Sequence, residues 1–302
     1  MLVVASSDGV KLSDGPGAWR TELGGHGIDA VVPDGTTLWA LVDGHQVWQR
    51  FPEGGWALAS SSDERLTCLA PATPGGPLLG TAGAFLGRID GAGHIDAFPE
   101  FAHAPTREQW YTPSGGPPDV RSLAVAGDGT WFVNVHVGGI LRSSDGGASW
   151  SATLDLHADV HQVICPRPYQ PGLVLAACAD GLAISRDSGT SWRLRDEGLP
   201  TPYSRAVAVA GDTVLMSASS GPRGGNAGLY RAPLDGWGRF QRCRGGLPED
   251  LGGNIDTRWL AVGGGEAALV SALGDVYASS DEGVSWVLVG QGLVGPAGLS
   301  WA

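Results

Sequence analysis

Lysine is almost absent from this chain. Among 302 residues the only lysine is Lys11, and methionine occurs just twice. Acidic residues outnumber basic ones by 31 to 19, which gives a net charge of −12. This charge disfavours binding to nucleic acid or to an anionic membrane, because phosphate groups repel such a chain at long range. A local basic pocket is still compatible with it.

Long apolar runs are missing as well. No run of eighteen apolar residues occurs, so the sequence predicts no transmembrane helix. The first nine residues lack the basic and long apolar segments of a signal peptide and are typical of a strand. We therefore expect a cytoplasmic protein.

Cysteine is scarce, and its spacing fits no zinc-binding pattern. Each cysteine lies in an apolar, strand-like context, which predicts buried and reduced thiols rather than disulfides. The four positions are Cys68, Cys165, Cys178 and Cys243.

Glycine and tryptophan, in contrast, are abundant, with 49 and 12 residues. Hydrophobic residues make up 42% of the chain, which is enough for a sizeable core. Many short apolar runs separated by glycine are typical of a turn-rich all-β protein.

One motif, Ser-x-Asp-x-Gly-x-x-Trp, occurs three times, at 143–150, 185–192 and 279–286, and a decayed copy runs from Asp14 to Trp19. The carboxylate can accept backbone N–H groups across a tight turn, and the glycine can take a positive φ there. Asp145 and Asp187 are 42 residues apart, and Asp187 and Asp281 are 94 apart, or twice 47. Such periods are typical of propeller blades.

The strand pattern between these motifs predicts an all-β fold, a seven-bladed β-propeller forming a single domain over residues 1–302. Its first blade is split, so that N-terminal strands are closed by a C-terminal innermost strand, which removes exposed sheet edges. The predicted blades are 2–23 with 295–302, then 28–60, 65–112, 119–156, 160–198, 204–248 and 254–292.

The three motifs resemble the Asp-box of BNR-repeat proteins, which include sialidases, sortilin-type propellers and bacterial WD40/YVTN/BNR-like proteins, often labelled glycosyl hydrolases. Sialidases have six blades and an Arg-Ile-Pro motif near the start. The nearest string here is Arg88-Ile89-Asp90, so a sialidase is not expected. The chain is also similar to seven-bladed uronate-specific polysaccharide lyases in its His, Tyr and Arg residues, and to the photosystem II assembly propeller in its arginines.

Cations recur at the start of the innermost strands. In a propeller, the connections that lead into these strands lie on the top face, whereas the Asp-box turns lie beneath. Arg121, His161, Arg205 and Arg258 occupy equal positions in four blades, and Arg65 lies just before the strand of another. Such a ring would repel itself by about 1–4 kcal/mol per close pair unless an anion bound there. In the alternative, each arginine pairs with an acid such as Glu64, Asp119 or Asp256.

The longest connection, residues 99–119, is predicted to lie on the same face as a lid. It carries Arg107 and Trp110 as candidate ligand-binding residues, and Glu108 and Tyr111 as secondary catalytic candidates. Alternatively, the two aromatic side chains simply cover the channel mouth.

Histidines also gather at the top. We expect His136 and His161 to lie close together and to be the best acid–base candidates. Weak metal-ligand candidates are His26, His103, His136 and His161, although no motif requires a metal or any other cofactor. Ordinary hydrogen-bonded histidines are the alternative.

The sequence thus predicts binding of a small anionic ligand or carbohydrate, bearing a carboxylate or phosphate, in an Arg- and His-lined pocket on the top face. A sugar acid fits this description, and the residues are compatible with a hydrolase or a lyase. The alternative is a non-catalytic propeller that binds a protein or a metabolite.

Overall fold

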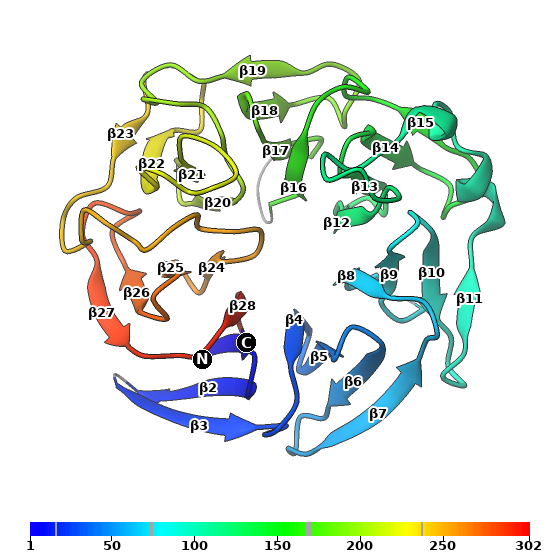
Figure 1. Ribbon diagram of the computed structural model, residues 1–302, viewed down its shortest axis with the longest axis horizontal. Helices are drawn as coiled ribbons and strands as arrows, with labels where there is room; N and C mark the ends of the chain where they lie inside the picture. The colour runs from blue at the N-terminus through cyan, green and yellow to red at the C-terminus, as the bar shows by residue number, and fades with distance from the viewer. Residues whose placement is uncertain (16, 73–74, 167–170, 237) are drawn as a thin grey trace.

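Seven four-stranded antiparallel sheets surround a central axis (Figure 1). The computed structural model describes residues 1–15, 17–72, 75–166, 171–236 and 238–302, and the sheets are those of this part of the chain. The predicted seven-bladed β-propeller is therefore confirmed. Each sheet is one blade, and the blades are numbered here from the N-terminus.

The strands are listed from the axis outwards. Blades 1 to 4 contain β28 (Pro296–Trp301), β1 (Leu2–Ser6), β2 (Gly9–Gly15) and β3 (Ala18–Glu22); β4 (Ile28–Asp34), β5 (Thr37–Val42), β6 (Gln46–Arg50) and β7 (Trp56–Ser61); β8 (Leu66–Ala70), β9 (Leu78–Thr81), β10 (Leu86–Ile89) and β11 (Ile95–Ala97); β12 (Val120–Val125), β13 (Trp131–Val135), β14 (Gly139–Ser143) and β15 (Ser151–Ala152). Blades 5 to 7 contain β16 (Val160–Ile164), β17 (Val174–Cys178), β18 (Gly181–Ser185) and β19 (Arg193–Arg195); β20 (Val207–Ala210), β21 (Thr213–Ala218), β22 (Gly228–Pro233) and β23 (Gln241–Arg242); β24 (Leu260–Gly263), β25 (Glu266–Val270), β26 (Val276–Ser279) and β27 (Val287–Gly290).

The first blade is split, as the sequence predicts. β28 pairs antiparallel with β1, with Leu2 opposite Trp301 and Val4 opposite Leu299. The red C-terminal strand accordingly lies beside the blue N-terminal strands (Figure 1). Leu2, Val4 and Leu299 pack against the buried strands of blade 7, so the closure is apolar as well as hydrogen-bonded.

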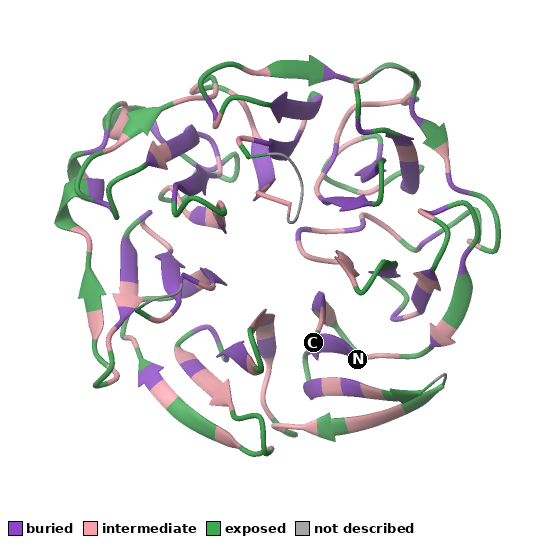
Figure 2. Cartoon of the chain, turned by 180° about the vertical axis from the view of Figure 1, so that it is seen from behind, coloured by how far each residue is buried: buried purple, intermediate pink, exposed green. Residues whose placement is uncertain are grey.

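Burial follows the distance from the axis. β13 and β17 are buried at every position, because each is covered by the neighbouring blade on both faces. The outermost strands, such as β27, are largely exposed (Figure 2). Cys68, Cys178 and Cys243 are buried and Cys165 is half-buried, and all four are free thiols, as expected. Burial raises the pKa of Cys68 and Cys178 to about 12, which keeps both thiols protonated.

The repeated motif forms the turn between the third and fourth strands of its blade. In blade 4, the amide of Ser149 donates to the Asp145 carboxylate at 2.9 Å, and the amide of Gly147 donates to the Ser143 hydroxyl, also at 2.9 Å. Gly147 has a φ of +95°, and a Cβ there would lie 2.8 Å from the ring atoms of Trp131. The turn therefore needs glycine for both its backbone and its packing.

Two short 3-10 helices, η1 (Pro99–His103) and η2 (Arg107–Gln109), lie in the long connection between blades 3 and 4. They sit at the outer rim of the ring (Figure 1). Neither they nor any other helix in the described ranges has the length and apolar character needed to cross a membrane.

Candidate functional site

A bulge at the top of the innermost strand sets the geometry of the site. In β4, β8, β12, β16 and β28 the pairing register slips by one residue at the same place. The extra residue is not paired, so its position is set apart from the ladder. The corresponding residues of blades 6 and 7 directly precede Ala206 and Trp259, whose carbonyl groups accept from the next strand. Going round the axis from blade 2 to blade 1, the seven equivalent residues are Asp29, Thr67, Arg121, His161, Arg205, Arg258 and Ala297.

The ring is thus partly cationic, and Arg65 is not a member of it. Arg65 lies two residues before Thr67, which occupies the bulge of blade 3. The four predicted cations of blades 4 to 7 do occupy equivalent positions.

Asp256 holds two of these cations together. Its carboxylate lies 2.7 Å from Nη1 of Arg205 and 3.3 Å from Nη2 of Arg121, and it also accepts the amide of Thr257 at 2.7 Å. Burial raises the pKa of Asp256, but the charges of Arg205 and Arg121 outweigh this and leave the pKa below its usual value. The contact joins blades 4, 6 and 7 across the axis, as the sequence-based alternative of acid pairing describes.

Beside this cluster lies a pocket of about 420 Å³. Three arginines and three aspartates line it: Arg65, Arg121, Arg258, Asp29, Asp119 and Asp256. Most of these acids are engaged, since Asp256 binds two arginines and Asp29 accepts the amide of Gly44 at 2.8 Å.

Arg65 and Arg258 differ from the other arginines of the pocket. Within the described ranges, neither guanidinium group makes a hydrogen bond or ion pair, and Nε of Arg258 is buried without a partner. Arg258 also has a φ of +67°, a conformation that costs energy for a residue with a Cβ. Two unneutralised cations therefore face one pocket, and one of them is held by a strained backbone.

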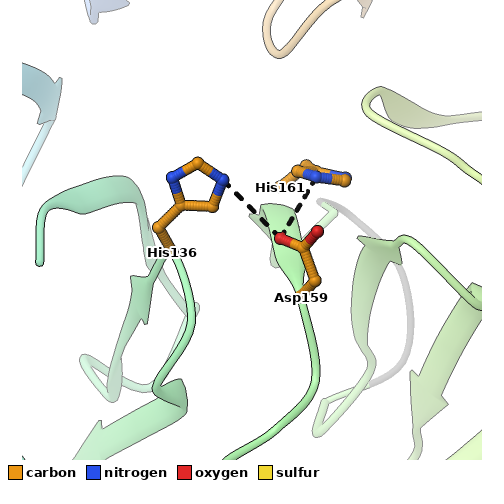
Figure 3. Close-up of side chains that lie close together, drawn as sticks. All are labelled: His136, Asp159 and His161. Carbon is orange, nitrogen blue, oxygen red and sulfur yellow. Dashed lines mark ion pairs between the residues drawn. The ribbon is translucent and has the colours of Figure 1, made fainter. Parts of the chain in front are cut away.

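His136 and His161 lie together beside Asp159 (Figure 3). The two ring centroids are 6.0 Å apart. His161 is completely buried, and its Nδ1 lies 2.5 Å from the carbonyl oxygen of Ser204. Burial lowers the pKa of His161, so the ring is neutral near pH 7 and donates its proton to that carbonyl. His136 contacts Arg121, whose Nη1 lies 2.9 Å from its Nε2.

The long connection does not line the pocket. Arg107 donates to the carbonyl groups of Ala84 at 2.6 Å and Gly83 at 3.0 Å, and it covers the rings of Phe85 and Trp110. Trp110 is itself buried in the core with Phe101.

The predicted lid is therefore wrong as a position, because its apolar side chains are buried between blades. Glu108 and Tyr111 are exposed, and neither is among the residues lining the pocket. Their predicted roles in catalysis or binding have no geometric support here.

The remaining predicted histidines are dispersed. His26 pairs with Asp43 at 2.8 Å, and His45 lies 3.1 Å from the carbonyl oxygen of Ser62. His103 is exposed at the end of η1. Neither His26 nor His103 lies in the cluster formed by His136, Asp159 and His161.

Sequence reasoning missed Asp159 and Tyr203. Tyr203 contacts Arg205 through its hydroxyl at 3.2 Å and stacks on His161, with 4.8 Å between ring centroids. A signal for Asp159 exists, since three blades read Asp-x-Arg or Asp-x-His, as in Asp119-Val-Arg121, Asp159-Val-His161 and Asp256-Thr-Arg258. Each acid thus precedes a ring cation by two residues.

A larger cavity, of about 680 Å³, lies at the other end of the axis. It is lined mainly by small and apolar residues of the 123–129 and 163–165 segments. Its charged members are Asp34 and Asp128, and the latter accepts the amide of Thr130 at 2.9 Å. Size alone favours this cavity, but the chemistry lies at the top.

No protein-family model matches the chain, and no curated protein matches it. Solved structures do. YCF48 from Cyanidioschyzon merolae has a TM-score of 0.67 and 14% identity, over 90% of this chain and 88% of that one. The WD40 β-propeller domain of Doa1 has a TM-score of 0.64 and 13% identity, over 95% of this chain and 86% of that one.

An ancestral GH74 enzyme is similar at a TM-score of 0.63 and 15% identity, over 94% of this chain. The chain spans 40% of that enzyme's length. At these identities the likeness shows the propeller fold alone. Because the neighbours include enzymes and a WD40 domain, the fold does not select a function.

Proposed function

We propose that the protein binds a small ligand with a carboxylate or phosphate group in the top-face pocket, held by Arg65 and Arg258. The observation that supports this most is that both guanidinium groups face the pocket without a hydrogen bond or ion pair among the described residues. A guanidinium group presents paired donors that match a carboxylate or phosphate.

Arg121 and Arg205 have a different role in this proposal. Asp256 neutralises both, so they shape the wall of the pocket rather than bind the anion. This assigns the ligand-binding part of the predicted ring to Arg258, joined by Arg65 from outside the ring.

The acids of the pocket narrow the ligand class. Asp29 and Asp119 line the same pocket as the two arginines. A plain anion such as acetate would meet these acids as repulsive neighbours. A sugar acid or hydroxy acid would place its carboxylate on the arginines and donate its hydroxyl groups to the acids. We therefore propose a hydroxylated acid as the ligand.

We also propose that the three repeated turns are Asp-boxes of the BNR type and that the protein works in the cytoplasm. The turns lie away from the pocket and hold the blades together. If the site is catalytic, His136 and His161 are the acid–base candidates, since imidazole titrates near neutral pH. A hydrolase or lyase acting on a sugar acid would use them beside the bound carboxylate.

The test is a calorimetric and thermal-shift comparison of glucuronate, gluconate, phosphate and acetate. Arg65→Gln and Arg258→Gln each remove one charge from the pocket. Arg244→Gln removes the same charge from an exposed site, where Arg244 pairs with Glu249, and serves as the matched control. We expect glucuronate or gluconate to bind better than acetate, and each pocket variant to lose about 1.5–3 kcal/mol, or roughly 10–100-fold in affinity.

The control should bind like the wild type. If no anion binds the wild type, or if Arg244→Gln weakens binding as much as the pocket variants do, the proposal fails. The non-catalytic scaffold for a protein or metabolite would then replace it.

A further inference from the structure

Three potential metal ligands converge beside the pocket but outside its lining. His136 follows β13, Asp159 precedes β16, and His161 lies in the bulge of β16. Oδ1 of Asp159 lies 3.6 Å from Nε2 of His136 and 3.3 Å from Nε2 of His161 (Figure 3). One ligand atom from each residue lies within 4.8 Å of the others. The three side chains point at a common centre.

The atoms at this centre lack partners. Nε2 of His161 is buried and accepts no hydrogen bond, and Oδ1 of Asp159 is likewise buried without one. The His161 ring gives its Nδ1 proton to the carbonyl of Ser204, so Nε2 carries a lone pair. A lone pair and a carboxylate oxygen 3.3 Å apart repel each other unless a cation lies between them.

The outer contacts of both rings support the same conclusion. Nδ1 of His161 faces the Ser204 carbonyl, and Nδ1 of His136 lies 3.4 Å from the Asp119 carboxylate. Metal-binding histidines usually donate their second ring nitrogen to a carbonyl or carboxylate, which fixes the ring with its other nitrogen toward the metal. Here both rings are held with Nε2 inward.

We infer that His136, Asp159 and His161 form a binding site for one divalent transition-metal ion. Two imidazole nitrogens and one carboxylate oxygen suit Zn²⁺ and its neighbours such as Co²⁺, rather than Ca²⁺ or Mg²⁺, which prefer oxygen ligands. Ligand atoms around tetrahedral Zn²⁺ are about 3.3 Å apart, as follows from bonds of about 2.0 Å. Binding thus requires the two rings to move closer by a small rotation.

Arg121 competes with the ion for this centre. Its Nη1 lies 2.9 Å from Nε2 of His136, the atom that would bind the metal. A bound ion displaces this contact and repels the guanidinium group. Arg121 keeps its second partner, Asp256, in either state. Removing the Arg121 charge should therefore strengthen metal binding, which a purely structural imidazole–carboxylate network does not predict.

The experiment uses untagged, EDTA-treated and dialysed protein titrated with CoCl₂ and ZnCl₂. Visible absorption of Co²⁺ and calorimetry report the affinity and the stoichiometry. Asp159→Asn and His136→Gln remove ligands, Arg121→Gln removes the competitor, and Asp43→Asn alters the exposed His26–Asp43 pair as a matched control. Circular dichroism confirms that each variant is folded. Two separate ligand variants keep the test valid if one of them does not fold.

We expect one ion per chain, with the Co²⁺ absorption of nitrogen and oxygen ligands. Each ligand variant should bind at least about 100-fold more weakly, since even the loss of an outer contact costs 10–100-fold. Arg121→Gln should bind severalfold more tightly, and Asp43→Asn should match the wild type. Absence of saturable 1:1 binding overturns the inference, as do wild-type affinities in the folded ligand variants or a weaker affinity in Arg121→Gln. Neither result depends on whether an anion binds Arg65 and Arg258.

Discussion

Asp256→Asn perturbs the contact on which the geometry of the top face depends. The carboxylate accepts from Arg205 at 2.7 Å, from Arg121 at 3.3 Å and from the amide of Thr257 at 2.7 Å. Asparagine has nearly the same shape but no charge, so two half-buried guanidinium groups lose their counter-ion. The arginine side chains are 18% exposed and Asp256 is 34% exposed.

The size of the effect follows from these contacts. A charge-assisted hydrogen bond contributes about 1.5–3 kcal/mol, and loss of a partly solvated ion pair costs less because water screens it. Since asparagine still accepts one hydrogen bond, we expect the free energy of unfolding to fall by about 2–3 kcal/mol. Urea unfolding measures this change. Glu249→Gln breaks the exposed Arg244–Glu249 pair instead and should cost at most about 1 kcal/mol.

The same change should strengthen anion binding. Asp256 lines the pocket beside Arg258 and Arg121, so its neutralisation leaves more positive charge there. We expect glucuronate to bind Asp256→Asn roughly tenfold more tightly than the wild type, a difference of about 1.4 kcal/mol. Ligand at 100 times its Kd then restores about 2.7 kcal/mol of stability. A variant as stable as the wild type, or one that glucuronate stabilises less than the wild type, would refute the assigned role of Asp256.

Three further predictions concern other parts of the molecule. Deletion of residues 296–302 removes β28 and exposes β1, so the protein should aggregate, and an unchanged melting temperature would contradict the closure. Hydrogen bonds within each turn lower the pKa of Asp145, Asp187 and Asp281 to about 2, so their stabilisation is complete above about pH 4 and is lost as the pH falls toward 2. Acid titration of Asp145→Ala should show a smaller loss than the wild type, whereas its affinity for glucuronate stays the same. Arg107→Gln removes two hydrogen bonds to carbonyl groups and should cost about 1–3 kcal/mol in urea unfolding, but a change in its anion affinity would show that the long connection belongs to the site.

The blades and their closure could be predicted because local chemistry specifies them. A turn that needs Asp, Gly and Trp at fixed spacing leaves a periodic trace, as at Asp145-Gly-Gly147. The equivalent positions of Arg121, His161, Arg205 and Arg258 could be predicted for the same reason, because they follow from aligning the innermost strands.

Pairing across the axis could not be predicted. Asp256 takes two arginines from blades that are distant in sequence, and which acid takes which cation depends on side-chain conformation rather than on spacing. The register of Arg65 was also hidden, because a bulge at Thr67 leaves no mark in the sequence. In the 99–119 connection, Phe101 and Trp110 are equally compatible with a core and with a lid, and only packing decides between them.

Whether Arg65 and Arg258 hold the same anion is measured most directly by a double-mutant cycle in calorimetry. Glucuronate is titrated into the wild type, Arg65→Gln, Arg258→Gln and the double variant, with Arg244→Gln as the control of equal charge. We expect each single change to weaken binding roughly 10–100-fold, and the two changes to be coupled by about 0.5–3 kcal/mol, as for residues that share one ligand group. Equal affinities in all five proteins would contradict the assignment of an anion site to this pocket.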